Sequence, residues 1–99
     1  MKKIEEIREN FTKADQMTRQ AEADLKKLKT FVKDFKKIEA NLKALTDYYQ
    51  ADWLEDVEQW YAQTSDENYY SAGQDAIWNA AQDLHEGKIA LLKLIAKSL

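Results

Sequence analysis

Four acidic side chains in the middle of the chain have the residue types and spacing that could do chemistry. They are Asp52, Glu55, Asp56 and Glu58. On a helix the first three would share one face, where carboxylates could hold a divalent cation or exchange a proton with a substrate. Acidic residues in the first turn of a helix are also favoured by the helix dipole, with no ligand involved. Because no calcium-loop pattern accompanies these residues, we favour the dipole interpretation and predict no metal site and no cofactor.

The single histidine is a second candidate for catalysis. His85 has Ala81 and Ile89 one helical turn to either side, which is typical of a core or boundary histidine. No serine partner is identifiable from the spacing, and no Glu-x-x-His pair exists for a di-iron site. The chain has no cysteine, which excludes disulfides, thiolate zinc sites and cysteine nucleophiles. We therefore predict a protein that is not an enzyme.

Eight of the eleven aromatic residues fall between positions 48 and 78, interleaved with acids. Tyr and Trp carry much of the binding energy at protein interfaces, and they also fill small cores. Eight large rings exceed what one small core commonly buries, so we expect some of them to face a groove. The predicted protein-binding residues are Tyr48, Tyr49, Trp53, Asp56, Glu58 and Trp60.

Charge is segregated along the chain, although the net charge is only −3. Residues 1–43 hold 12 basic and 8 acidic side chains, whereas residues 44–87 hold ten acids and no Lys or Arg. The acidic stretch could fold back along the basic one and partly neutralise it, or it could dock a basic partner protein. Nucleic-acid binding through the lysines of 26–43 is a further hypothesis. We rank it last, because that block holds no Arg and matches no nucleic-acid module.

Composition and periodicity predict an all-α fold. The 99 residues include no Pro and two Gly, which excludes the turn-rich sandwiches and barrels. Apolar residues recur in heptads from Ile4 through Phe35 and beyond, which predicts one long, coiled-coil-like helix over 3–46. We expect this helix, a short helix over 52–61 and a long helix over 72–97 to pack as a helical bundle or hairpin. Together they form a single domain, residues 1–99.

Local signals define the ends of the two later helices. Asp52 is a candidate N-cap for the short helix, and the segment from Ser71 to Gln74 has the spacing of a capping box for the last helix. The last helix has so narrow a polar stripe that we expect more than one neighbour to cover it. Gly87 interrupts this helix, as a kink or a close-packing point.

The long helix carries an apolar seam that the last helix is too short to cover. At about 1.5 Å per residue, the last helix spans roughly 39 Å and the first more than about 60 Å. Because exposed apolar stripes usually mark association, we predict a homodimer in which the N-terminal parts pair. The alternative is a break near Lys29 and Thr30 that folds the helix back. The predicted dimer seam consists of Ile4, Ile7, Phe11 and Ala14.

Hydropathy argues against a membrane location. Charges interrupt the first residues every two or three positions, so no secretory signal is recognisable. The most apolar stretch, 89–96, contains Lys93 and is far shorter than the about 20 residues that span a bilayer. We therefore expect a soluble, cytoplasmic protein.

The segment YYQADWLEDVE, from Tyr48 to Glu58, resembles a family of small bacterial proteins described as domain of unknown function 4298. The segment from Ser71 to Asn79 is similar to that family's last motif. This chain lacks the glycine expected after the Tyr pair, and 60–70 lacks the family's glycine- and proline-bearing link. The resemblance implies a small bacterial, cytoplasmic, helical protein and supplies no activity, since the family has none assigned.

These observations lead to one functional hypothesis and two alternatives. We expect a non-enzymatic helical protein-interaction module, a homodimer with an acidic aromatic docking surface for a basic protein partner. The first alternative is a small-ligand or divalent-cation site in the bundle, built from Asp52, Asp56 and tyrosine hydroxyls. The second is nucleic-acid binding through the lysine-rich helix segment.

Overall fold

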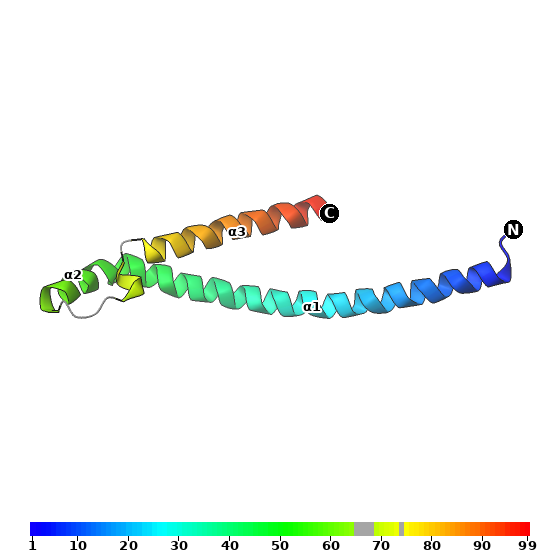
Figure 1. The fold of residues 1–99 in the computed structure, drawn as a ribbon, viewed down its shortest axis with the longest axis horizontal. Helices are drawn as coiled ribbons and strands as arrows, with labels where there is room; N and C mark the ends of the chain where they lie inside the picture. The colour runs from blue at the N-terminus through cyan, green and yellow to red at the C-terminus, as the bar shows by residue number, and fades with distance from the viewer. Residues whose placement is uncertain (65–68, 74) are drawn as a thin grey trace. The chain divides into compact units, whose positions relative to one another are not determined.

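The computed structural model describes residues 1–64, 69–73 and 75–99, and these residues form helices and turns without a strand (Figure 1). The element order is α1 (Ile4–Ala51), α2 (Trp53–Gln63), a 3-10 turn η1 (Tyr70–Ala72) and α3 (Ala76–Ser98). This order confirms the all-α fold class and the sequence of long, short and long helices. The contacts divide the chain into unit 1, Met1–Ile38, and unit 2, Glu39–Leu99.

Unit 1 is helical from Ile4 onward and is stabilised by local contacts. Its residues are mostly good helix formers, and Glu5 and Glu6 lie in the first turn, where the helix dipole favours acids. Side-chain hydrogen bonds and ion pairs here join residues four apart, such as Thr18 Oγ1 to the carbonyl of Ala14 at 2.8 Å. Because α1 is continuous through residues 29–30, the alternative of a break there is wrong.

The predicted dimer seam lies open on the surface of unit 1. Ile4 is 64 % exposed and Phe11 is 66 % exposed, while Ile7 and Ala14 are half-buried. Leu25, Leu28 and Val32 continue the exposed apolar positions along the same helix. In proteins most of the stability of a helix comes from packing of its apolar face, and within unit 1 these positions have no such packing.

Unit 2 begins with the last part of α1, which ends at Ala51 and not near residue 46 as predicted. The two tyrosines, Tyr48 and Tyr49, therefore lie in its last turn. One residue, Asp52, separates α1 from α2. It occupies the N-cap position as predicted, and its carbonyl accepts the first helical hydrogen bond from the N–H of Asp56 at 2.9 Å, but its side chain makes no capping bond.

The predicted capping box before the last helix is wrong. Helix α3 begins at Ala76, with Asp75 in the N-cap position and no side-chain capping bond. Ser71 lies instead inside η1, a turn closed by the N–H of Ala72 on the carbonyl of Tyr69 at 3.0 Å. Ser71 lies in this turn, and its carbonyl accepts a hydrogen bond from Trp53 of α2, so it does not lie at the start of α3. Gln74, the other end of the box, lies outside the described residues.

The described residues bury very little apolar surface. Ile77, at 5 % exposure, is the single buried residue among those that the structure describes. Apolar residues of α3 such as Leu92 and Leu94 are 66 % and 68 % exposed, so the expectation that several neighbours cover this helix is wrong for the single chain. Its interior Gly87 is not a close-packing point, since an added Cβ would meet nothing within 4 Å.

An ion pair joins the two long helices inside unit 2. Lys88 Nζ of α3 lies 3.0 Å from Glu39 Oε1 of α1, and it donates a hydrogen bond to Oε2 at 3.4 Å. Both side chains are partly exposed, so this pair contributes at most about 1 kcal/mol. It places α3 beside the last part of α1 (Figure 1).

Candidate functional site

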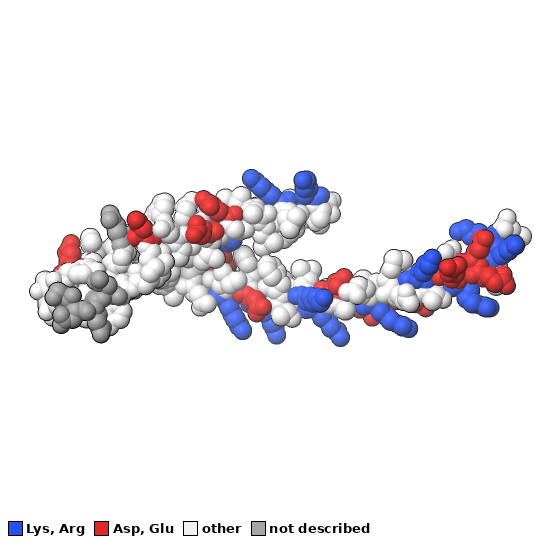
Figure 2. Space-filling view, viewed as in Figure 1, with Lys and Arg blue, Asp and Glu red and all other residues white. Residues whose placement is uncertain are grey.

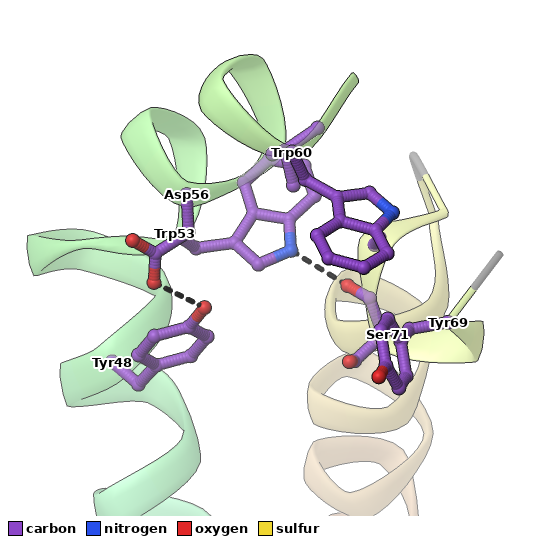
Figure 3. A pocket seen from close by; sticks show the side chains of 8 residues that line it. Tyr48, Trp53, Asp56, Trp60, Tyr69 and Ser71 are labelled. Atoms are coloured by element: carbon purple, nitrogen blue, oxygen red, sulfur yellow. Dashed lines mark hydrogen bonds between the residues drawn. The ribbon is translucent and has the colours of Figure 1, made fainter. Parts of the chain in front are cut away.

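Aromatic residues of unit 2 surround a cavity of about 170 Å³ (Figure 3). Tyr48 reaches it from the last turn of α1. Trp53, Asp56 and Trp60 reach it from α2, where their spacing of three and four residues puts them on one helix face. The remaining lining residues are Val57, Tyr69, Ser71 and Ala72.

Two hydrogen bonds hold the walls of this cavity in place (Figure 3). Trp53 Nε1 donates to the backbone carbonyl of Ser71 at 2.6 Å, which ties α2 to η1 across 18 residues of sequence. Tyr48 Oη donates to Asp56 Oδ2 at 2.8 Å, which ties α1 to α2. The hydrogen bond to Asp56 raises the pKa of the Tyr48 phenol above its ordinary value of 10.0, with a smaller contribution from burial. The phenol therefore stays protonated and donating at neutral pH.

Ring contacts add to these hydrogen bonds. The rings of Trp60 and Tyr69 meet edge to face, with centroids 5.4 Å apart. Those of Tyr49 and Trp53 are tilted, with centroids 4.9 Å apart. Aromatic pairs prefer such offset arrangements and gain about 0.5–1.5 kcal/mol each beyond the area they bury. The contact of Trp60 with Tyr69 places Tyr69, the residue before η1, against α2.

The structure brings together four of the six predicted protein-binding residues. Tyr48, Trp53, Asp56 and Trp60 line the cavity, whereas Tyr49 contacts it only through the Trp53 ring. Glu58 is exposed on α2 and does not line the cavity.

Sequence reasoning missed the other half of the lining. Val57 could have been found, because it lies four residues after Trp53 and three before Trp60, on the same helix face. Tyr69, Ser71 and Ala72 could not, because their approach depends on how the chain returns after α2.

The acidic cluster is positioned as the start of a helix. Glu55 and Asp56 lie in the first turn of α2, and Gln59 Nε2 donates to Glu55 Oε1 at 3.0 Å. Within residues 1–64, 69–73 and 75–99, no three His, Asp or Glu side chains gather as metal ligands do. His85 is exposed on α3.

Charge on unit 2 follows the segregation seen in the sequence. Acidic side chains lie over α2 and the first half of α3, and basic ones over its last turns (Figure 2). Where the lysine-rich block 26–43 meets the acidic stretch, Lys43 Nζ pairs with Asp47 Oδ2 at 2.7 Å, one helical turn away. The acids of α2 have no such neighbour in sequence.

Comparison with known protein families places the whole arrangement in context. The profile of the family described as "Domain of unknown function (DUF4298)" matches residues 1–94. The chain belongs to this family. Membership in DUF4298 confirms the resemblance carried by the segments around Tyr48 and Ser71. No curated protein and no solved structure matches the chain.

The helices also bear on a membrane location. In the part of the chain that the structure describes, no helix combines the length and the apolar character needed to cross a bilayer. Helix α3 has the most apolar composition of the three described helices, and even this helix carries three lysines, Lys88, Lys93 and Lys97.

Proposed function

We propose that this chain is a non-enzymatic helical interaction module that acts as a homodimer and docks a basic partner protein. One observation carries the proposal. Among the described residues Ile77 is the buried one, while the apolar stripes of α1 and α3 stay exposed. A chain that folds with so small a core gains its stability from a partner.

The energetics favour association along the seam. Full burial of a side chain such as Phe11 or Leu28 stabilises by about 1.5–3 kcal/mol, and each protomer contributes several such positions. A symmetric pair buries the same stripe twice, which suits a self-complementary coiled-coil contact. The heptad spacing of Ile4, Ile7, Phe11 and Ala14 fits this geometry.

The docking surface consists of the six predicted protein-binding residues, Tyr48, Tyr49, Trp53, Asp56, Glu58 and Trp60. Large amphipathic rings and nearby carboxylates are the composition of a protein-binding patch for a basic partner. The absence of Lys and Arg over residues 44–87 leaves the local potential negative. We further propose a cytoplasmic location and a bacterial source.

The cavity also supports a second candidate, a small-ligand site. Its lining includes the Asp56 carboxylate and the Tyr48 phenol, which the first alternative names, but not Asp52, which that alternative also names. The divalent-cation form of this alternative has no support, since the acids of the described residues do not gather as ligands. Nucleic-acid binding by the lysine-rich segment 26–43 has no further observation in its favour.

Light scattering on a sizing column, at low and high salt, tests the dimer. We expect a species of twice 11.6 kDa that salt does not dissociate, because an apolar seam is not screened. A monomer at tens of micromolar would overturn the proposal of a homodimer.

Pull-down with Tyr49→Ala and Trp53→Ala variants tests the docking surface. We expect both variants to remain helical and to lose basic proteins that the wild type recovers. Recovery of the same proteins by the variants would show that the surface is not used.

A further inference from the structure

Among the described residues, the lining of the unit 2 cavity combines aromatic rings with one carboxylate. Tyr48, Trp53, Trp60 and Tyr69 supply the rings, and Asp56 supplies the carboxylate. The face of an aromatic ring is electron-rich and attracts cations, most strongly for Trp. The chemistry of this lining therefore selects a positively charged group over a neutral or anionic one.

The carboxylate in the lining has no cation to neutralise it. Asp56 takes part in no ion pair among the described residues, and its described partner is the neutral Tyr48 hydroxyl. Since residues 44–87 contain no Lys or Arg, the surrounding sequence offers no cation either. A cation entering the cavity would meet both the rings and an unpaired negative charge.

The cavity is held in shape before any ligand arrives. The Trp53 indole is fixed by the Ser71 carbonyl, the Tyr48 phenol by Asp56, and the Trp60 ring packs against Tyr69 (Figure 3). A preformed site spares the ligand the entropic cost of ordering these rings.

Its size limits what it can hold. A volume of about 170 Å³ lies below the range of roughly 300–1,000 Å³ that is common for sites of drug-sized molecules. It is suited to the tip of one side chain, while the rest of the partner lies on the docking surface outside.

We propose that this cavity is an aromatic cage that receives one basic side chain, Lys or Arg, of the partner protein. The proposal rests on the proposed docking function and names the group that enters. The cage rings bind the cation through their faces, and the Asp56 carboxylate pairs with it.

The three tryptophans offer a direct test by NMR of the indole N–H groups. Trp53 and Trp60 line the cage. Trp78 of α3 does not line it and is 55 % exposed, so it serves as the control for nonspecific binding. The probe is N-acetyl-arginine amide, and its neutral counterpart is N-acetyl-citrulline amide. We expect arginine to shift the signals of Trp53 and Trp60 only, with citrulline about fivefold weaker. Equal effects of both probes, equal shifts at Trp78, or no shift would overturn the cage.

A matched pair of variants separates the charge of the cage from the charge of the surface. Asp56→Asn keeps an oxygen for the Tyr48 hydroxyl and removes the charge, so we expect arginine to bind about three- to fivefold more weakly. Glu55→Gln removes a charge from the same helix, outside both the lining and the docking surface, and should change binding by less than about twofold. Equal losses in both variants would contradict a specific role for Asp56. Unchanged helicity and an unchanged Trp78 signal confirm that each variant folds.

A basic peptide distinguishes a protein partner from a free metabolite. We expect an eight-residue peptide with one central Arg flanked by Lys to bind at least about tenfold more tightly than the amino acid, because the docking surface adds contacts. Equal affinity would overturn the protein partner and leave a small-molecule site. Sedimentation of the same samples keeps the proposals apart. A monomer that binds arginine contradicts the homodimer alone, and a dimer that ignores arginine contradicts the cage alone.

Discussion

The two units of the chain are stabilised in different ways. In unit 1 the side-chain hydrogen bonds and ion pairs of the described residues join positions four apart on one helix. In unit 2 they also join positions far apart, such as Trp53 to Ser71 and Lys88 to Glu39. Unit 1 therefore lacks tertiary support of its own and exposes a seam, whereas unit 2 has enough to position a cage. The proposed association and the proposed recognition therefore fall in separate parts of the chain.

The largest effect should follow from a charge in the seam of unit 1. Phe11→Asp places a carboxylate where the proposed dimer is apolar, so we expect self-association to weaken by at least about 100-fold and helicity to fall. Sedimentation velocity and far-UV circular dichroism measure both. Gln16→Asp, an exposed polar position of the same helix, is the control and should leave the dimer intact. A Phe11→Asp protein that still dimerises would move the interface away from this seam.

The next effect concerns the tie between α2 and η1 in unit 2. Trp53→Phe removes the 2.6 Å hydrogen bond to the Ser71 carbonyl, so we expect the free energy of unfolding to fall by about 1–2 kcal/mol. Urea denaturation at a fixed protein concentration measures the change. Trp78→Phe, at an exposed position of α3, should cost less than about 0.5 kcal/mol. Equal costs would mean that the cage adds nothing to the stability of unit 2.

A smaller effect, of opposite sign, is expected in α3. Gly87 lies inside the helix, and an added Cβ meets no atom within 4 Å, so Gly87→Ala should stabilise by about 0.5–1 kcal/mol. Thermal unfolding measures it. A destabilised Gly87→Ala protein would instead place the second copy against this part of α3, and so extend the association from unit 1 into unit 2.

The smallest effect is a change in the titration of Tyr48. Its pKa is raised because its hydroxyl donates to Asp56, so Asp56→Asn should lower it toward the ordinary value of 10.0. Since the folded pKa exceeds the unfolded one, this contact stabilises the fold below about pH 10 and is lost as the pH rises through the raised pKa. NMR of ¹³Cζ-labelled tyrosine measures the midpoint. An unchanged midpoint in the variant would show that the hydroxyl does not rely on Asp56.

The helices were predictable because their signals are local. The heptad positions from Ile4 to Phe35 and the lack of proline suffice to place α1, and the structure changes only where it ends. The capping box at Ser71 failed for a reason outside its own sequence. Its backbone is engaged by Trp53, 18 residues earlier, and a turn forms where the spacing alone predicted a helix start.

The candidate site shows the same division. Trp53, Asp56 and Trp60 share a face of one helix, so their spacing reveals them together. Tyr69 and Ser71 join them through contacts between separate elements, which no periodicity encodes. Tyr49 and Glu58 are close in sequence to residues of the cage, but they are not part of its lining. Adjacent residues on a helix point in different directions.

The hydrogen bond between Trp53 and Ser71 has an evolutionary consequence. Its donor is the indole N–H, which only tryptophan carries, whereas its acceptor is a backbone carbonyl that every amino acid carries. Among homologues we therefore expect position 71 to vary among small residues and position 53 to remain tryptophan. Within the DUF4298 family, a constant tryptophan at position 53 together with a variable residue at position 71 would be the result of this hydrogen bond.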